Sequence, residues 1–201
     1  MIPFRLQVKY FLENPQAVDV GAFIGLFQRW IQQNPLPEML IDVADYRHVV
    51  EGPGVLLVGH RSDFAMESAD GRLGLLYTRK READGSLQDQ LRSAFRITLT
   101  ACKLLEADST FNPKLKFRAD EVEIRFVDRL QLPNQPETLD KVRDDVSAVL
   151  AELYDGARVS FAPLSTDPRH VFTLSVQAEG ATSVAALLDH LKPDPQALAN
   201  G

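Results

Sequence analysis

The sequence predicts an α+β protein with a mainly antiparallel sheet and helices on one side of it. Three observations carry this prediction: segments that alternate apolar and polar residues, segments with apolar residues at helical spacing, and a similar order of such segments in two halves of the chain. Of the 201 residues, 45% are hydrophobic and 25% are charged, which is typical of a globular protein. A chain of this length can bury a core without covalent crosslinks.

The first half opens with an alternating strand over residues 4–10. One face carries Phe4, Leu6, Val8 and Tyr10, and the other carries Arg5, Gln7 and Lys9. Asn14-Pro15 ends this strand. We expect Asp19 to cap a helix whose apolar stripe includes Phe23 and Phe27, with Trp30 at its edge.

A short strand at 39–43 and an irregular stretch at 44–53 follow. The apolar run at 54–59 predicts a strand buried on both faces. The Asp70-Gly71 pair predicts the turn of a hairpin between residues 64–68 and 72–80. A long helix then begins after Ser86, and Cys102 falls on its apolar stripe, so we interpret it as a core residue.

The second half repeats the pattern with a strand at 122–126 and a helix that begins near Pro136. Two strands, at 158–163 and 170–178, and a short helix after Ser183 complete it. The predicted organisation is therefore two strand-helix-strand-strand-helix halves, 1–112 and 113–192, packed as one pseudo-symmetric unit, with a flexible tail at 193–201. Only the order of elements supports a duplication, because residue identity between the halves is negligible.

Composition argues against several kinds of site and partner. The net charge of −6 argues against nucleic-acid binding, which depends on clustered Lys and Arg. The single cysteine excludes an internal disulfide and a zinc site of several thiolates. It is also consistent with a reducing compartment, and neither a signal peptide nor a membrane-spanning run is apparent. We therefore expect a cytoplasmic protein without a membrane partner.

One concentration of polar residues is the candidate site. It comprises Asp42, Asp45, Tyr46, Arg47 and His48, followed by His60, Arg61 and Asp63. Side chains that follow a central strand can point into a cleft. Two Asp and two His could hold a metal ion, with Asp45, His48, His60 and Asp63 as candidates, or could form a His–Asp pair for general base chemistry. The competing interpretation is that these residues serve turns and surface ion pairs.

Other acidic runs have a simpler interpretation. Asp120, Glu121 and Glu123 alternate with apolar residues and predict an exposed strand face.

The leading functional hypothesis is a non-catalytic protein that binds a protein partner or a small ligand, in a groove between the halves or along the sheet, with a possible homodimer through an edge strand. The alternative is a metal-assisted hydrolase or related enzyme that uses the Asp42/Asp45/His48 and His60/Asp63 cluster. No cofactor is indicated by the sequence.

Overall fold

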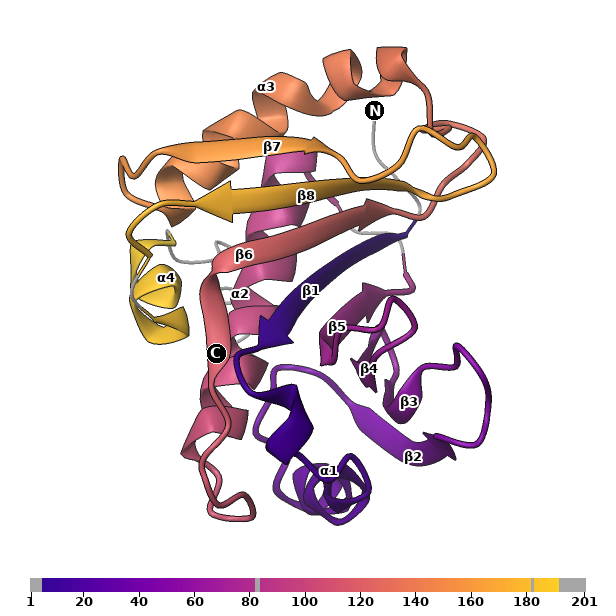
Figure 1. The fold of residues 1–201 in the computed structure, drawn as a ribbon, viewed down its shortest axis with the longest axis vertical. Helices are drawn as coiled ribbons and strands as arrows, with labels where there is room; N and C mark the ends of the chain where they lie inside the picture. The colour runs from indigo at the N-terminus through magenta and orange to yellow at the C-terminus, as the bar shows by residue number, and fades with distance from the viewer. Residues whose placement is uncertain (1–4, 82–83, 182, 192–201) are drawn as a thin grey trace.

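The computed structural model describes residues 5–81, 84–181 and 183–191. Within these ranges one antiparallel sheet has the strand order β2-β3-β4-β5-β1-β6-β8-β7, and helices pack behind it (Figure 1). The strands are β1 (Leu6–Leu12), β2 (Leu40–Tyr46), β3 (Gly54–Gly59), β4 (Ser62–Glu67), β5 (Gly74–Arg79), β6 (Phe117–Phe126), β7 (Val159–Pro163) and β8 (Phe172–Ala178). The helices are α1 (Ala22–Gln33), α2 (Leu87–Ala107), α3 (Pro136–Leu153) and α4 (Val184–His190). The predicted α+β class with a mainly antiparallel sheet is confirmed.

The alternation of β1 divides the molecule into two environments. Leu6, Val8 and Tyr10 join the apolar core that the four helices cover. Gln7 and Lys9 point to the opposite side of the sheet, which we call the open face. Because each neighbouring strand continues this period of two, the open face extends over all eight strands.

Local signals in the sequence set several helix boundaries. The Ser86 hydroxyl accepts a hydrogen bond from the Asp89 backbone N–H, and the Asp89 carboxylate accepts one from the Ser86 N–H, which forms a capping box at the start of α2. Pro136 occupies the first turn of α3, as predicted. Asn34 adopts a left-handed conformation and ends α1.

Three sequence predictions are wrong in detail. Asp19 does not cap α1: the helix begins at Ala22, and the Asp19 carboxylate accepts a hydrogen bond from the Gly21 N–H in the preceding turn. β3 is not buried on both faces, because Val55 and Leu57 are buried, whereas Leu56 and Val58 on the other face are only half-buried. The irregular stretch predicted at 44–53 is shorter, because β2 continues to Tyr46 and only residues 47–53 lie outside the strands.

β1 connects the two parts of the chain. It pairs with β5 on one side and with β6 on the other, so the sheet is continuous across the boundary at residue 112.

Trp30 and Cys102 lie in the core, as their stripes predicted. No helix in the described ranges is long and apolar enough to cross a membrane. The tail predicted at 193–201 lies outside the described residues, and the internal duplication stays a prediction.

Candidate functional site

Lys9 lies at the centre of the open face and is fully buried. Its ammonium nitrogen is 2.6 Å from Glu67 Oε2 and 2.7 Å from Asp70 Oδ1. Burial raises the pKa of Asp70, but the hydrogen bonds from Lys9 and from the Arg72 N–H, together with the charges of Lys9 and Arg125, outweigh this effect and lower the pKa overall. Lys9 therefore joins the central strand to the β4–β5 hairpin, through a buried ion pair with Glu67 and a partly exposed one with Asp70.

Arg125 on β6 extends this ion pair into a network. Its guanidinium is 2.8 Å from Glu123 Oε2, 3.4 Å from Asp70 Oδ2 and 3.8 Å from Glu67 Oε1. Glu67 and Glu123 are buried, with 5% and 3% of their surfaces exposed. Two cations therefore face three carboxylates in a region largely shielded from water.

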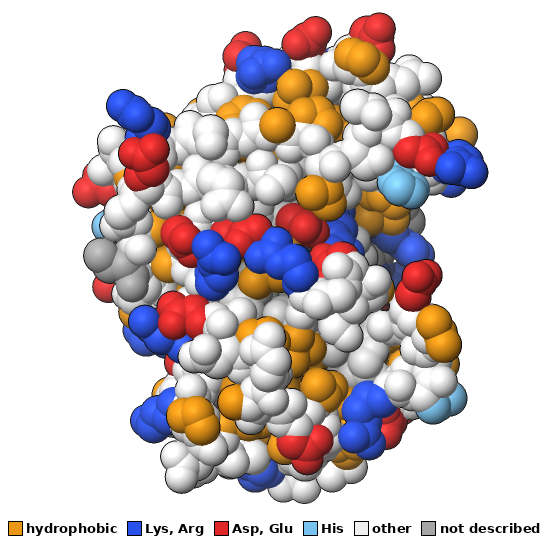
Figure 2. All heavy atoms as spheres, viewed as in Figure 1, with side chains coloured by type: hydrophobic (Ala, Val, Ile, Leu, Met, Phe, Trp, Pro, Cys, Tyr) orange, Lys and Arg blue, Asp and Glu red, His pale blue; other side chains and the backbone are white. Residues whose placement is uncertain are grey.

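A second group of charges continues along the same strand. Arg72 donates two hydrogen bonds of 2.6 Å to the Glu121 carboxylate and stacks 3.8 Å from the centre of the Phe11 ring. The hydrogen bonds from Arg72 lower the pKa of Glu121. Arg118 is 3.2 Å from Glu121 and 2.8 Å from Asp120. Figure 2 shows acidic and basic side chains gathered in a row across the middle of this face.

A bulge in β6 explains how so many charges reach one face. Phe117 and Ala119 belong to the core before the bulge, and Val122 and Ile124 belong to it afterwards. The register with β1 shifts in between. One face therefore receives even-numbered charged residues before the shift and odd-numbered ones after it. We call this row the β6 charge row: Arg118, Asp120, Glu121, Glu123 and Arg125.

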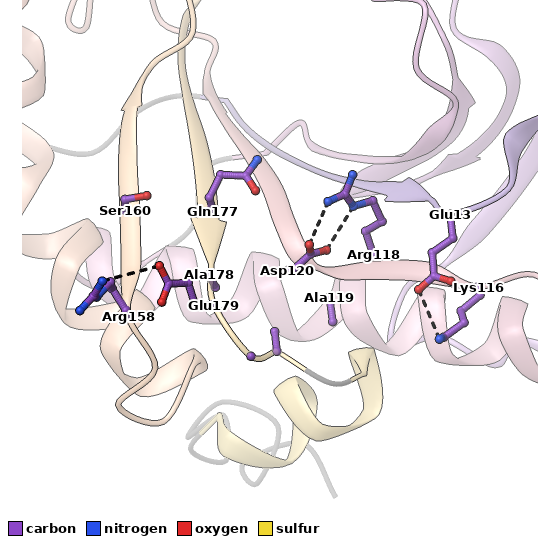
Figure 3. Close-up of a pocket in the computed structure, with 12 residues that line it drawn as sticks. Glu13, Lys116, Arg118, Ala119, Asp120, Arg158, Ser160, Gln177, Ala178 and Glu179 are labelled. Atoms are coloured by element: carbon purple, nitrogen blue, oxygen red, sulfur yellow. Dashed lines mark hydrogen bonds and ion pairs between the residues drawn. The ribbon is translucent and has the colours of Figure 1, made fainter.

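The first end of the β6 charge row lies in a pocket of about 860 Å³, which we call the strand-end pocket (Figure 3). It lies where β6 begins, β8 ends and β7 begins. Its lining residues are Glu13, Lys116, Arg118, Ala119, Asp120, Arg158, Ser160, Gln177, Ala178, Glu179, Gly180 and Ala181. This volume falls within the range of ordinary ligand sites.

Three ion pairs line the strand-end pocket. Arg118 and Asp120 are 2.8 Å apart, Lys116 and Glu13 are 3.3 Å apart, and Arg158 and Glu179 are 3.8 Å apart. Figure 3 shows Lys116, Arg118 and Asp120 along one segment, with Arg158 and Glu179 on the other side of the pocket. The Arg158 pair is the most exposed, with 82% of the Arg158 side chain accessible. Ion pairs of this kind contribute little to stability, so a ligand can replace a partner at low cost.

The other end of the β6 charge row borders a smaller cavity of about 340 Å³, which we call the face hollow. The β4–β5 turn supplies one wall through Ala69 and Asp70, and the loop before β8 supplies the other through Ser165 and His170. The His170 Nδ1 atom lies 2.9 Å from the Ser165 hydroxyl, which holds this loop together. The face hollow therefore lies between segments from both halves of the chain.

The two cavities share strand β8. Thr173 lines the face hollow and pairs with Arg125, whereas Gln177 lines the strand-end pocket and pairs with Glu121. Four residues of strand separate them, which corresponds to about 14 Å at about 3.4 Å per residue. The open face thus carries two cavities at the two ends of one row of charges.

The candidate residues from the sequence lie elsewhere, around the edge strand β2. Asp42 lies on the open face, whereas Asp45 shares the helix side with Val43, because an odd spacing on a strand changes the face. Asp42 accepts a hydrogen bond from the Val43 N–H. Asp45 accepts one from the Arg47 N–H and pairs with its guanidinium, which lowers the pKa of Asp45 to about 2.

The remaining candidates are not drawn together into one group. His48 is exposed in the turn after β2, and Tyr46 lines a shallow cavity of about 290 Å³ there. His60 and Arg61 form the turn between β3 and β4 and are exposed. Asp63 pairs with Lys80 at 2.7 Å. The part of the chain that the structure describes contains no group of three or more His, Cys, Asp or Glu side chains that could hold a metal ion.

The sequence interpretation missed the β6 charge row. Glu121 and Glu123 were predicted to lie on an exposed strand face, but they are buried, because Arg72, Arg125 and the hairpin cover them. The sequence contained one sign of the buried network. Lys9 lies midway along a strand with a strong apolar face, and a lysine at such a position calls for an acidic partner. In the structure Lys9 and Glu123 are direct neighbours across the sheet.

A scan against protein-family models finds no match, and searches of curated proteins and of solved structures find no significant one. What the open face does is therefore argued from its own geometry and chemistry.

Proposed function

We propose that this chain is a non-catalytic binding protein whose strand-end pocket holds a small ligand that carries both a positive and a negative charge. The observation that carries the proposal is the set of three exposed ion pairs around one pocket of about 860 Å³. A cytoplasmic location belongs to the same proposal and rests on the single cysteine.

The alternation of charges favours a zwitterion over an ion of one sign. An anion that binds Arg158 displaces Glu179 and leaves that carboxylate without its partner. A cation that binds Glu179 does the same to Arg158. A ligand with an ammonium and a carboxylate satisfies both, so the exchange leaves no unpaired charge. Free amino acids and short peptides are the common molecules with this property.

The buried network beneath the open face supports a functional rather than a stabilising role. A buried ion pair often contributes no more to stability than apolar residues of similar volume would, because removing charges from water is costly. The chain nevertheless has ionisable residues, Lys9, Glu67 and Glu123, buried in the middle of the sheet. We interpret the network as a rigid support that fixes Arg118 and Arg125 at the two cavities.

A binding measurement tests the proposal. The full chain is titrated by calorimetry with the twenty amino acids and with Ala-Ala, and Ala-Ala is compared with its N-acetylated and its C-amidated form. We expect binding of one or more free zwitterions, with binding weaker by up to about fivefold for each singly charged form of Ala-Ala, as the loss of one exposed ion pair implies.

A pair of matched variants places the binding site. Ser160→Trp should fill the strand-end pocket and abolish binding, because Ser160 is exposed on its floor. Ser147→Trp, at an exposed position of α3, makes the same substitution away from the sheet and should bind as the wild type does. Absence of binding for every zwitterion, or equal binding by both variants, would contradict the proposal.

The predicted duplication bears on how such a surface could arise. β1 and β6, the first strands of the two halves, lie side by side and antiparallel at the centre of the sheet. A pseudo-twofold axis between them would produce this arrangement, so we propose the duplication as the origin of the fold. Superposition of the β1–α1 and β6–α3 units is the direct test, and different packing angles would argue against it.

A further inference from the structure

We infer that the open face binds a short peptide in extended conformation, with its carboxyl terminus in the strand-end pocket and its amino terminus in the face hollow. The inference rests on the proposed function, because it specifies which zwitterion the open face accepts. It assigns a role to the face hollow, which a single amino acid in the strand-end pocket would leave unused.

The spacing of the two cavities sets the length of the peptide. Thr173 and Gln177 line different cavities and are separated by four residues of one strand, or about 14 Å. A peptide in extended conformation also advances by about 3.4 Å per residue. A peptide of about five residues therefore reaches from one cavity to the other, and one of two or three residues does not.

The floor between the cavities is suited to a peptide backbone. On β7 and β8 the open face carries Ser160, Ala162 and Ser175, which are small side chains that allow close approach. The β6 charge row runs beside this floor and offers both signs of charge to the peptide's side chains. Because the row is held by buried ion pairs, it is preorganised for binding.

The charges at the two ends determine the direction of the peptide. The network at the face hollow has three carboxylates, Glu67, Asp70 and Glu123, and two cations, Lys9 and Arg125, so negative charge is in excess there. Asp70 is the most exposed of the three carboxylates, so it is the group an amino terminus would meet. In the strand-end pocket, Arg158 and Lys116 have the longest ion pairs and exposed side chains, so they are the cations most readily available to a carboxyl terminus.

A length series tests the inference. The wild-type chain is titrated by calorimetry with alanine peptides of two to seven residues that have free termini. We expect the affinity to rise by up to about fivefold between three and five residues, because the amino terminus then exchanges the exposed Glu179 for the less exposed Asp70, and then to level off. N-acetylation of the five-residue peptide should remove this gain, because the amino terminus then carries no charge.

Variants of the face hollow give an independent measurement. Ala69→Trp should fill the hollow and lower the affinity for the five-residue peptide to that of Ala-Ala, while Ala-Ala itself binds as before. Ala148→Trp, at an exposed position of α3, is the matched control.

The outcomes separate the inference from the proposed function. An affinity that does not depend on peptide length, or that is unchanged by N-acetylation, would overturn the extended peptide and leave the strand-end pocket as a zwitterion site. Failure of every zwitterion to bind the wild-type chain would refute both the extended peptide and the proposed function.

Discussion

The Lys9 ammonium lies 2.6 Å from the Glu67 carboxylate, and both groups are buried on the side of the sheet opposite to the helices. On the outer side of an antiparallel sheet such residues would ordinarily face water. Here the β4–β5 hairpin and the neighbouring arginines cover them, so the open face has a polar interior of its own. The consequences for stability differ from those of a surface ion pair.

Replacement of Lys9 by methionine should strongly destabilise the protein. Lys9→Met removes the cation that faces Glu67 and Asp70 and leaves buried negative charge without its partner. Loss of one member of a buried ion pair costs about 3–5 kcal/mol of unfolding free energy. Urea unfolding monitored by the fluorescence of Trp30 measures this change. Lys103→Met, at an exposed position of α2, should change the stability by less than about 0.5 kcal/mol.

A second substitution distinguishes the ion pair from simple packing. If the cost arises from unpaired charge, Glu67→Gln combined with Lys9→Met should recover part of the lost stability, because one buried negative charge is removed. If the double variant is as unstable as the sum of the two single variants, the network does not act as a coupled unit.

The stability of the protein should decrease in acid, partly through Glu121. Hydrogen bonds from Arg72 are the main reason that its pKa in the folded protein is lower than its ordinary value of 4.5. A lowered pKa stabilises the folded state fully above pH 4.5, and this contribution is lost as the pH falls through the folded-state value. Arg72→Gln should therefore reduce the loss of stability below pH 4.5. Urea unfolding across a pH series measures the free energy of unfolding of both proteins. If it falls equally steeply below pH 4.5 in the variant and the wild type, this role of Glu121 is refuted.

Much of the fold could be predicted from the sequence, because the signals that set it are local. Period-two alternation identified β1 and β6, and the Asp70-Gly71 pair identified the hairpin. Helical spacing identified α2, with Cys102 on its buried face, and the Pro136 signal marked the start of α3. The errors occur where local preference and tertiary context disagree. The polar residues of β2 resemble a loop, but pairing with β3 holds them as a strand.

The candidate site could not be predicted in the same way, because it depends on register. Lys9 and Glu123 are more than a hundred residues apart, and only the pairing of β1 with β6 brings them together. The bulge in β6 moves Glu121 and Asp120 to one face, which no periodicity in the sequence reveals. The Asp42–Asp63 cluster appeared convergent because its members are close in the sequence, whereas in the structure Asp42 and Asp45 lie on opposite faces and His48 and His60 lie in exposed turns.

Cys102 should be unreactive in the folded protein. Burial raises the pKa of its thiol well above the ordinary value of 9.0, so the reactive thiolate is scarce, and the side chain is inaccessible. Iodoacetamide at about pH 8 should leave the native protein unmodified and alkylate it fully in concentrated guanidinium chloride, as measured by mass spectrometry. Rapid alkylation under native conditions would contradict the packing of α2 in the core.

Asp42 and Asp45 should protect the edge of the sheet rather than bind metal. β2 is an edge strand: the Asp42 carboxylate occupies the backbone N–H of Val43 within it, and the Asp45 carboxylate occupies that of Arg47 in the turn that follows. Exposed Ile41 and Val50 lie beside this edge. Edge strands with free hydrogen-bonding groups and apolar neighbours tend to pair with a second chain. The double variant Asp42→Ala/Asp45→Ala should therefore self-associate as its concentration rises, as measured by sedimentation velocity.

Two controls separate hydrogen bonding from charge in this experiment. Asp42→Asn/Asp45→Asn keeps an acceptor for each N–H and should stay at the oligomeric state of the wild type, although it loses the same two charges. Asp140→Ala/Asp144→Ala removes two exposed carboxylates from α3 and should also leave that state unchanged. If all three variants self-associate, the loss of net charge is the cause. If a metal ion copurifies with the wild type and is lost with Asp45→Ala, the metal-site hypothesis replaces this one, because edge protection requires no metal.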